Sequence, residues 1–346
     1  MDTSSIRLGW KAALSNTRFL GRPYKATFAL TYACNSKCRT CGIWSRKKGD
    51  ELALDEIRLF ARRNAHFSWI AVTGGEPFLR GDLPEIAAAF KEHMRGLHIF
   101  NITTNGLLPR KAEASMKKML SLGIPRVVAV VSLDGPKALH DSIRGVEGSW
   151  ERAVETFARL KALEKKRGFR VFFGYTASSY NAGAFSETIH AVRRLHPHVT
   201  QTDFHVNLFH ASPHYYANER SGGAASDIGD ITEAKRGLPA DLMSLAEKTY
   251  ASFTGDYIRT RKAPLPCKAL KSSVFIDPYG RVYPCTIFDS PLGSLRETGY
   301  RLSPLLDSEK AKKAASCVGR SCPQCWTPCE AYQSIIGNAP RLLVRK

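Results

Sequence analysis

The chain has 346 residues, of which 43% are hydrophobic, and a formal net charge of +20 at pH 7. This composition supports a large core in one or two domains, and no run approaches the roughly 18 apolar residues of a membrane span. The N-terminal residues lack the apolar segment of a signal peptide, and many thiols suit a reducing compartment, so we expect a cytoplasmic protein. The charge is diffuse, which makes nucleic acid or an anionic membrane surface a less favoured partner.

Short β-rich runs alternate with helical patterns from residue 25 onward. The expected strands are 26–32, 69–73, 98–103, 126–133, 171–176 and 203–208, and the expected helices between them are 55–64, 84–94, 112–121, 150–166 and 187–195. This order predicts a parallel sheet with right-handed crossovers. The predicted fold class is therefore α/β, with a partial (β/α)6 TIM-like barrel whose chemistry collects at the carboxyl ends of the strands.

Three cysteines, Cys34, Cys38 and Cys41, follow the first expected strand within one loop. A closed zinc site or a fully ligated cubane has four protein ligands, and no fourth Cys or His lies between Cys41 and His66. An odd total of nine cysteines argues against a disulfide framework. Three thiolates can bind three irons of a [4Fe-4S] cluster and leave the fourth iron open to a small molecule, so the spacing favours that cluster over a zinc knuckle.

Polar motifs also follow the next three strands. The second strand ends in a Gly-Gly-Glu-Pro run that begins at Gly74, the third is followed by Asn105, and the fourth ends near Ser132. Paired glycines allow a ligand to approach the backbone closely. The carboxylate of Glu76 suits an ammonium group, although a Gly-Gly pair alone is also common in simple turns.

The sixth strand and the loop after it concentrate polar and aromatic side chains. The candidates there for substrate contact or proton transfer are His205, Asn207, His210, Tyr215 and Tyr216. None of them is assigned as the catalytic acid or base by the sequence. Three other expectations concern structure: a helix over 6–20 that covers one end of the barrel, a helix N-cap at Asn181, and a boundary or active-site segment at 217–230.

The remaining six cysteines all lie beyond residue 263, at Cys267, Cys285, Cys317, Cys322, Cys325 and Cys329. The run 276–283, between the first two of these cysteines, reads as a strand, a turn and a second strand. By itself this pattern leaves two interpretations open, a zinc ribbon or an iron–sulfur site. In either case it predicts a second, smaller metal-bearing module.

Taken together, the cysteine loop and the strand-end motifs resemble the radical S-adenosylmethionine (SAM) superfamily. The segment from Ser132 through Arg144 is similar to the SPASM/Twitch branch, in which residues at these two positions contact SAM. The resemblance implies a [4Fe-4S] cluster on the three loop cysteines and SAM contacts at Thr40, Gly74, Gly75, Glu76, Asn105, Ser132 and Arg144. Thr40 departs from the aromatic residue common there, so either its backbone or Ile43 and Trp44 would contact the adenine.

The same resemblance implies a Twitch/SPASM-like module of a β-hairpin and helices at the C-terminus. Six thiols are too few for two fully ligated cubanes, so one auxiliary [4Fe-4S] cluster is expected. Its implied ligands are Cys267, Cys285, Cys322 and Cys325, with Cys329 as a substitute for one of them and Cys317 as the least favoured. The predicted domains are an N-terminal extension over 1–24, the barrel over 25–235, and a linker helix with the auxiliary module over 236–346.

The implied activity is reductive cleavage of SAM to a 5′-deoxyadenosyl radical that abstracts a hydrogen atom from a substrate. Oxidation or crosslinking of a peptide or small metabolite is the leading hypothesis, with an electron donor such as flavodoxin or ferredoxin. A radical SAM enzyme acting on RNA or an anionic lipid is the alternative, because of the positive charge. A zinc-stabilised nucleic-acid-binding protein is the non-enzymatic hypothesis.

Overall fold

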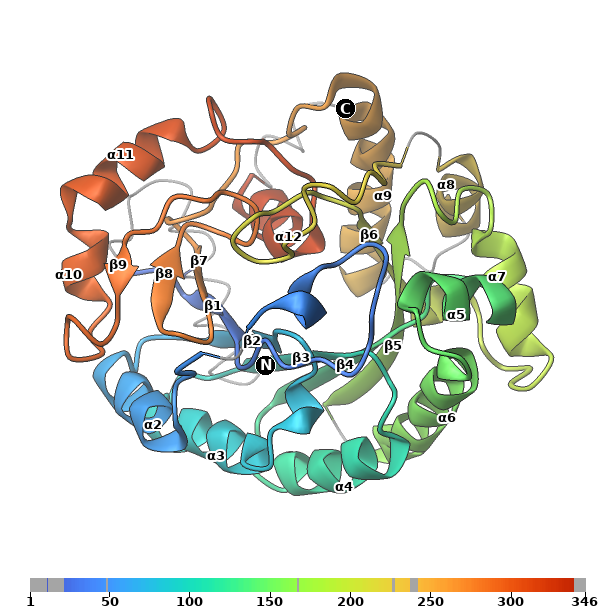
Figure 1. The fold of residues 1–346 in the computed structure, drawn as a ribbon, viewed down its shortest axis with the longest axis horizontal. Helices are drawn as coiled ribbons and strands as arrows, with labels where there is room; N and C mark the ends of the chain where they lie inside the picture. Colours follow the sequence, from blue (N-terminus) through green and yellow to red (C-terminus); the bar gives the residue numbers. More distant parts are fainter. Residues whose placement is uncertain are drawn as a thin grey trace.

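A single sheet enclosed by helices makes up most of the molecule (Figure 1). The computed structural model describes residues 11, 22–47, 49–166, 168–225, 228–236 and 242–338, with the side chains of 233–246 left aside. The predicted helix over 6–20, apart from Lys11, therefore lies outside the described residues.

Six parallel strands form the arc of a partial barrel, as predicted. In sheet order they are β6 (Phe204–Leu208), β5 (Phe169–Ala177), β4 (Arg126–Ser132), β3 (Ile99–Thr104), β2 (Trp69–Thr73) and β1 (Lys25–Ala29). Each pairs in parallel with its neighbour in the chain. Strand β1 ends at Ala29 rather than at the predicted residue 32, because the backbone beyond it turns toward the loop after β2 and bonds to that loop instead.

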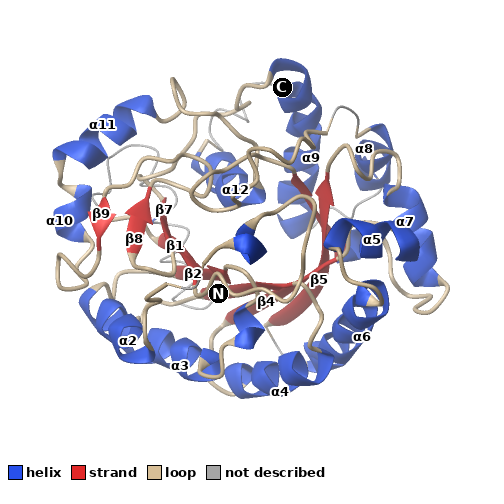
Figure 2. Cartoon of the chain, viewed as in Figure 1, coloured by secondary structure: helices blue, strands red, loops and turns tan. Residues whose placement is uncertain are grey.

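The crossover helices cover the outer face of the arc (Figure 2). They are α2 (Leu54–Arg63), α3 (Leu83–His93), α4 (Pro109–Leu120), α6 (Ser149–Lys161) and α7 (Phe185–Arg193), with a short additional helix, α5 (Lys137–Arg144). Alternate residues of each strand face these helices and are buried, as the period of two in a strand requires. One such contact stacks Phe157 of α6 on Phe173 of β5, with ring centroids 3.9 Å apart.

The predicted C-terminal hairpin is continuous with the barrel sheet. Strand β7 (Ser273–Ile276) pairs in parallel with β1, and β8 (Arg281–Tyr283) and β9 (Gly293–Ser294) follow in antiparallel order. All four residues of β7 are buried, which suits a strand with a neighbour on both sides. The division between barrel and auxiliary module at residue 235 thus stays a prediction, because one sheet spans both parts.

Two helices occupy the gap beyond the edge strand β6. Helix α9 (Leu242–Thr260) follows α8 (Gly229–Arg236), and α12 (Pro328–Gly337) follows α10 (Ser303–Leu306) and α11 (Glu309–Cys317). The backbone oxygen of Cys329, in the first turn of α12, accepts a hydrogen bond from Lys25 of β1, and Glu330 accepts one from Ser273 of β7 at 2.6 Å. Helix α12 therefore ties the β1–β7 side of the sheet to α9, which it also contacts.

Candidate metal centres and cofactor site

The cysteine loop is fastened to the glycine loop after β2. The amide of Gly75 donates to the carbonyl of Thr31 at 2.7 Å, and the amide of Glu76 donates to that of Ala33 at 2.9 Å. A Cβ at position 75 would lie 2.2 Å from the Ala33 oxygen, and Gly74 has φ +134°. Glycine is thus required here because another part of the same chain approaches closely. A ligand need not be invoked to explain the pair.

Glu76 joins the ends of β2 and β3. Its fully buried carboxylate accepts hydrogen bonds from the amide of Asn105 at 2.7 Å, the amide of Phe78 at 3.0 Å and the hydroxyl of Thr104 at 2.9 Å. Burial raises the pKa of Glu76 to about 7, although these bonds oppose the shift. The side-chain amide of Asn105 in turn donates to Asn35 at 2.8 Å and lies 3.8 Å from the sulfur of Cys34.

A buried cation lies on the other side of the cysteine loop. Arg144, at the end of α5, forms an ion pair with Asp134 at 2.6 Å, and both side chains are shielded from solvent. Its Nη1 atom is 3.7 Å from the sulfur of Cys38. Burial disfavours the charge on Arg144, but Asp134 and Cys38 outweigh it and raise its pKa. The Nε atom is buried and has no hydrogen-bond partner among the residues described, so one donor is left for an anion.

The three loop thiols lie close enough to influence one another. Burial, followed by smaller effects that include the thiolates of Cys38 and Cys34, raises the pKa of Cys41 to about 12, and burial raises that of Cys34 to about 11. Such thiols ionise when a metal supplies the compensating charge. In the described part of the chain no three Cys, His, Asp or Glu side chains already surround one metal ion. A cubane offers each thiolate its own iron, and the buried cation Arg144 beside the sulfurs suits an anionic cluster.

Ser132 and Thr40 lie at two further sides of this region. Ser132 ends β4 and is half-buried on the inner face of the barrel. Thr40 is half-buried, and its carbonyl oxygen accepts a hydrogen bond from the side-chain amide of Asn218 at 2.9 Å. Ile43 is buried, whereas the side chain of Trp44 is 44% exposed. The predicted SAM contacts therefore border one region at the carboxyl ends of β1 to β4, and their roles stay predictions.

Residues 210–218, which we call the bridging loop, cross from the cysteine loop to the second set of cysteines. The amide of Gly42 donates to the carbonyl of Tyr216 at 2.7 Å. At the other end, the hydroxyl of Ser212 donates to the carbonyl of Thr286 at 2.7 Å. The Nε2 atom of His214 lies 3.0 Å from the carbonyl oxygen of Cys285. The sequence suggested that this loop contacts substrate, but these contacts are internal to the protein.

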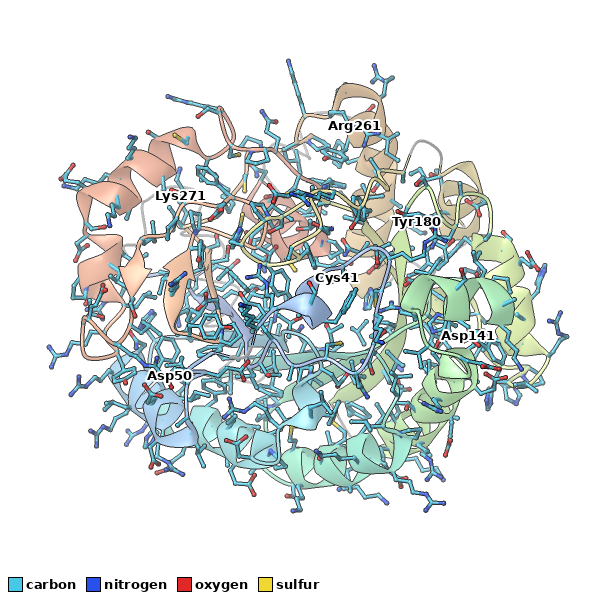
Figure 3. The ribbon with its side chains drawn as sticks, in the orientation of Figure 1. Cys41, Asp50, Asp141, Tyr180, Arg261 and Lys271 are labelled. Carbon is cyan, nitrogen blue, oxygen red and sulfur yellow. The ribbon has the colours of Figure 1, made fainter. Side chains whose placement is uncertain are left out.

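Tyr216 packs against both sets of cysteines. It contacts the apolar group that includes Cys41, and also the group that contains Cys285 with Cys267 and Cys325 beside it. Its ring lies 4.5 Å from that of Tyr215, whose hydroxyl is 2.7 Å from that of Thr73 on β2. Tyr216 is therefore packed between the two sets of thiols. Figure 3 labels Cys41 near the middle of the molecule, inside the ring of helices.

Four of the six C-terminal cysteines form a second group. Burial raises the pKa of Cys285 most, and the charges of Cys325 and Cys267 raise it further. The pKa of Cys267 is likewise raised, first by burial and Glu330 and then by Cys325 and Cys322. These are the four predicted ligands of the auxiliary cluster, although their role as ligands stays a prediction.

Cys329 and Cys317 differ from these four. After burial, the groups that act on the pKa of Cys329 are Lys25 and Glu330 rather than other cysteines. Cys317 lies at the end of α11, where its backbone oxygen accepts hydrogen bonds from Ser321 and Cys322. Cys329 and Cys317 thus stand apart from the four in these interactions, and the choice of ligands among the six stays a prediction.

The predicted N-cap at Asn181 is wrong. Helix α7 begins at Phe185, and the residue before it is Ala184. Asn181 instead donates to the carbonyls of Asp134 and Thr176 at 2.9 and 3.0 Å, so it joins the ends of β4 and β5. Together with Asp134 and Asn218, it belongs to the polar frame of the site that sequence reasoning missed. For Asp134 and Asn181 the position soon after a strand was a signal that could have found them, whereas Asn218 lies in a long loop without one.

His140 supports this frame in its neutral form. Its Nδ1 atom accepts a hydrogen bond from the amide of Asp134 at 3.0 Å, and burial lowers its pKa to about 3. Because the folded pKa lies below the unfolded value, the stabilisation is present above about pH 6.5 and is lost as the pH falls toward 3. We expect the wild-type protein to lose about 2 kcal/mol more than a His140→Asn variant between pH 6.5 and 5. Urea unfolding across this range, which should otherwise run parallel in the two proteins, measures the difference.

These features define an iron–sulfur protein built on a partial parallel barrel with a second cysteine set beside its open edge. The model of the radical SAM superfamily matches residues 28–197, and that of the SPASM iron–sulfur cluster-binding domain matches residues 267–334. The chain belongs to the radical SAM superfamily, in its SPASM/Twitch branch, and is an enzyme of that superfamily. A radical SAM domain implies SAM with a [4Fe-4S] cluster, and a SPASM domain implies auxiliary iron–sulfur binding.

Curated relatives match to different extents. A probable GTP 3′,8-cyclase of Sulfolobus acidocaldarius is 32% identical over 49% of this chain and 55% of its own length, so the chain spans about half of that relative. The sporulation killing factor maturation protein SkfB of Bacillus subtilis is 24% identical over 86% of this chain and 70% of its own.

Among solved structures, native anSMEcpe with bound AdoMet and Kp18Cys peptide has a TM-score of 0.55 at 16% identity. That match covers 93% of this chain and 99% of the other, and it bears on the fold alone. No helix within the described ranges is long and apolar enough to cross a membrane.

Proposed function

We propose that this chain cleaves SAM reductively and uses the resulting 5′-deoxyadenosyl radical to abstract hydrogen from a peptide substrate, with one auxiliary [4Fe-4S] cluster. The observation that carries the proposal is the cysteine loop, whose three thiols lie between buried Arg144 and the Glu76–Asn105 contact. The bound cluster would supply the electron that splits the sulfonium bond of SAM. The chain would hold it with Cys34, Cys38 and Cys41.

The protein side of this chemistry is mainly orientation and electrostatics. Arg144 places a fixed positive charge 3.7 Å from the sulfur of Cys38, and its buried Nε donor is left for a carboxylate of SAM or for the cluster itself. Glu76 and Asn105 hold the strand ends at a fixed separation. We assign the amino group of SAM to the loop 74–76 and its ribose or carboxylate to Ser132.

A peptide substrate is favoured by the extent of the matches. The relative named for maturation of the sporulation killing factor, and the solved structure with a bound peptide, each align with both halves of the chain. The GTP 3′,8-cyclase aligns with about half of it. Because substrate would lie between the two cysteine sets, resemblance across both halves carries more weight. Oxidation or crosslinking of the peptide, or of a small metabolite in its place, would follow hydrogen abstraction.

Action on RNA or an anionic lipid is the second candidate, and the net charge of +20 is the observation that favours it. It predicts binding of tRNA or acidic vesicles that persists to physiological salt, because phosphate contacts release counterions. The same assay on a zinc-only preparation addresses the non-enzymatic hypothesis of a zinc-stabilised nucleic-acid-binding protein. The match of residues 267–334 to the model of an iron–sulfur cluster-binding domain counts against that hypothesis.

The proposed function is tested with anaerobically reconstituted protein, SAM and dithionite. We expect 5′-deoxyadenosine and methionine, and transfer of deuterium into 5′-deoxyadenosine from short peptides deuterated at their side chains. Iron analysis should give about eight irons per chain for two cubanes. Zinc without iron, or no 5′-deoxyadenosine from iron-loaded protein, would sink the proposal.

The surface of the cysteine loop suits an acidic electron donor such as flavodoxin or ferredoxin. Residues 35–47 contain no Asp or Glu. The side chains of Lys37, Arg39, Lys47 and Trp44 are all exposed. Charge complementarity of this kind mainly raises the rate of association.

We expect a Lys37→Glu/Arg39→Glu variant to slow SAM cleavage driven by reduced flavodoxin about tenfold or more at low salt. Cleavage driven by dithionite should be unchanged, because a small reductant needs no docking surface. Lys165→Glu/Lys166→Glu is the matched control, since these exposed lysines precede β5 and lie at the opposite end of the strands. Equal losses in the two variants would contradict a docking role for the cysteine loop.

Replacing Cys285 by serine is expected to lower the iron content from about eight to about four per chain. Cys285 is buried beside Cys267 and Cys325, so its loss should leave the auxiliary cluster without a ligand at that side. Peptide turnover should be lost, whereas SAM cleavage without substrate should remain. Turnover at the wild-type rate would mean that the auxiliary cluster has no direct part in the reaction.

A further inference from the structure

The inner face of the barrel is accessible to solvent. On β3 to β6 the residues that face the helices are buried, whereas the alternate residues, from Asn101 on β3 to His205 and Asn207 on β6, are half-exposed. Alternate side chains of a strand point to opposite faces. The centre of the barrel is therefore lined by side chains that solvent, or a substrate, can reach.

His205 is held in a defined orientation on this inner face. Its Nδ1 atom is hydrogen-bonded to Glu247 of α9, and the hydroxyl of Tyr332 of α12 donates to the same carboxylate oxygen. The ring of Phe172, on the neighbouring strand, lies 4.1 Å from the imidazole. The side chains of His205 and Glu247 are 20% and 10% exposed. Three separate elements thus fix one imidazole.

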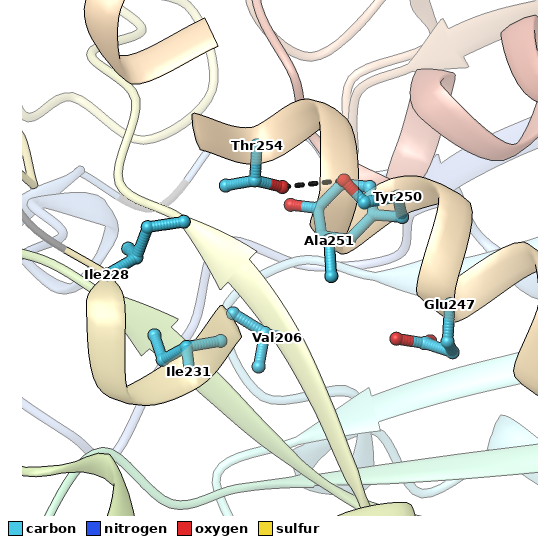
Figure 4. Close-up of a pocket in the computed structure, with 7 residues that line it drawn as sticks. All are labelled: Val206, Ile228, Ile231, Glu247, Tyr250, Ala251 and Thr254. Carbon is cyan, nitrogen blue, oxygen red and sulfur yellow. Dashed lines mark hydrogen bonds between the residues drawn. The ribbon is translucent and has the colours of Figure 1, made fainter. Parts of the chain in front are cut away.

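Helix α9 makes this arrangement possible because it covers the free edge of β6. Figure 4 shows Glu247 on α9 beside Val206 of β6, with Tyr250, Ala251 and Thr254 along the same helix. Val206 is buried under the helix, and His205, its neighbour in the strand, points to the other face. Glu247 therefore reaches His205 around the edge of the sheet.

Asn207 follows on the same face of β6, two residues nearer the carboxyl end. Its Oδ1 atom is buried and has no hydrogen-bond partner in the described part of the protein. A buried acceptor without a donor costs about 1 to 3 kcal/mol, so such an atom is retained where something else bonds to it. The adjacent imidazole and this acceptor form a polar pair in an otherwise half-open space.

The other two histidines of this region already have hydrogen-bond partners within the protein. His210 is buried against the hydroxyl of Tyr257 and the amide of Trp326, and burial lowers its pKa to about 4. His214 stacks on Tyr283 with centroids 4.4 Å apart and is bonded to the carbonyl of Cys285. Of the three histidines over 205–214, His205 is the one whose ring faces the inner surface of the barrel.

We propose that His205 is the base that accepts a proton from the substrate radical, and that Asn207 accepts a hydrogen bond from the same substrate. The proposal rests on the proposed function. It applies to a substrate in which the carbon that loses hydrogen bears an O–H, N–H or S–H group, as in an alcohol, amine or thiol side chain of a peptide. Glu247 and Tyr332 are positioning residues, because they act through the imidazole.

The substrate carbon concerned is attached to a heteroatom X. A hydrogen atom has already left the carbon for the 5′-deoxyadenosyl radical. The X–H bond then breaks, its proton forms a bond to Nε2 of His205, and one electron passes to an iron–sulfur acceptor. The carbon and X are left joined by a double bond, so the substrate has lost two protons and two electrons in all.

The first test needs no substrate. In cluster-loaded protein labelled with 15N-histidine, the signal absent from a His205→Gln variant identifies His205. At pH 7.5 we expect a neutral ring with its proton on Nδ1, toward Glu247, and a bare Nε2. In Glu247→Gln this tautomer preference should weaken. A doubly protonated ring, or a proton on Nε2, would overturn the proposal, because that nitrogen could not accept another proton.

The second test measures access to the same nitrogen. Diethyl pyrocarbonate modifies accessible neutral imidazoles, and peptide mass spectrometry locates the product. We expect His205 to be modified in native protein, whereas His140, which is fully buried, should be protected. Protection of both residues would show that substrate cannot reach His205 and would also overturn the proposal.

The third test separates this proposal from the proposed function. With a peptide that transfers deuterium to 5′-deoxyadenosine, His205→Gln should lower oxidised product about 100-fold or more relative to the 5′-deoxyadenosine formed. Glu247→Gln should cause a smaller loss and shift the pH profile of product formation. An unchanged ratio in His205→Gln refutes the role of His205 alone, whereas no 5′-deoxyadenosine from wild-type protein refutes the proposed function.

Discussion

Alanine at position 38 is expected to abolish reductive SAM cleavage. Two of the three loop thiols would remain, and two thiolates cannot hold three irons of a cubane. The variant also removes the sulfur that lies 3.7 Å from the guanidinium of Arg144. Formation of 5′-deoxyadenosine with dithionite as reductant measures the loss. The iron content should fall from about eight to about four per chain, because the auxiliary set is untouched.

Cys317→Ala is the matched control for this prediction. Cys317 is also half-buried, but it lies at the end of α11 and outside both groups of interacting thiols. We expect it to retain both the iron and the activity of the wild type. If Cys38→Ala cleaved SAM at the normal rate, the cysteine loop would not be the cluster site. If Cys317→Ala lost half of its iron, the auxiliary ligand set would need revision.

The second large effect is expected at Arg144. Its ion pair with Asp134 is shielded from solvent on both sides, at 2.6 Å. Removing one partner of a buried pair leaves an uncompensated charge, which costs about 3 to 5 kcal/mol. We expect Arg144→Gln to lose that much unfolding free energy in urea. SAM binding should weaken as well, because the buried Nε donor disappears with the guanidinium.

An Asp134→Asn/Arg144→Gln double variant separates stability from cofactor binding. It leaves no buried charge without its partner, so we expect it to recover much of the lost stability. SAM binding, followed as a perturbation of the cluster spectrum, should stay weak. Recovery of SAM binding in the double variant would mean that Arg144 acts only through the fold. Arg159, which is paired with Glu155 and Glu113 at the surface, provides a control in which replacement should cost far less stability.

The features read correctly from the sequence are local ones. Strand and helix positions follow from periodicity within a short stretch, so β2 was predicted at its observed limits, 69–73. The cysteine triplet needs no knowledge of distant residues, since all three thiols lie in one loop. Parallel strands with crossovers place their carboxyl ends at one edge. From that rule, Glu76 and Asn105 are expected to lie near each other, and the hydrogen bond between them agrees.

The sequence alone thus determined the barrel, the cysteine loop and the superfamily. Which distant groups meet was decided by the tertiary structure. The pairing of β7 with β1, the turn of Asn181 toward Asp134, and the path of the bridging loop all join residues far apart in the chain. His205 reaches Glu247 and Tyr332 because two helices close the open edge of the sheet. Periodicity reports which face of an element is buried, but only the packing of whole elements fixes what that face contacts.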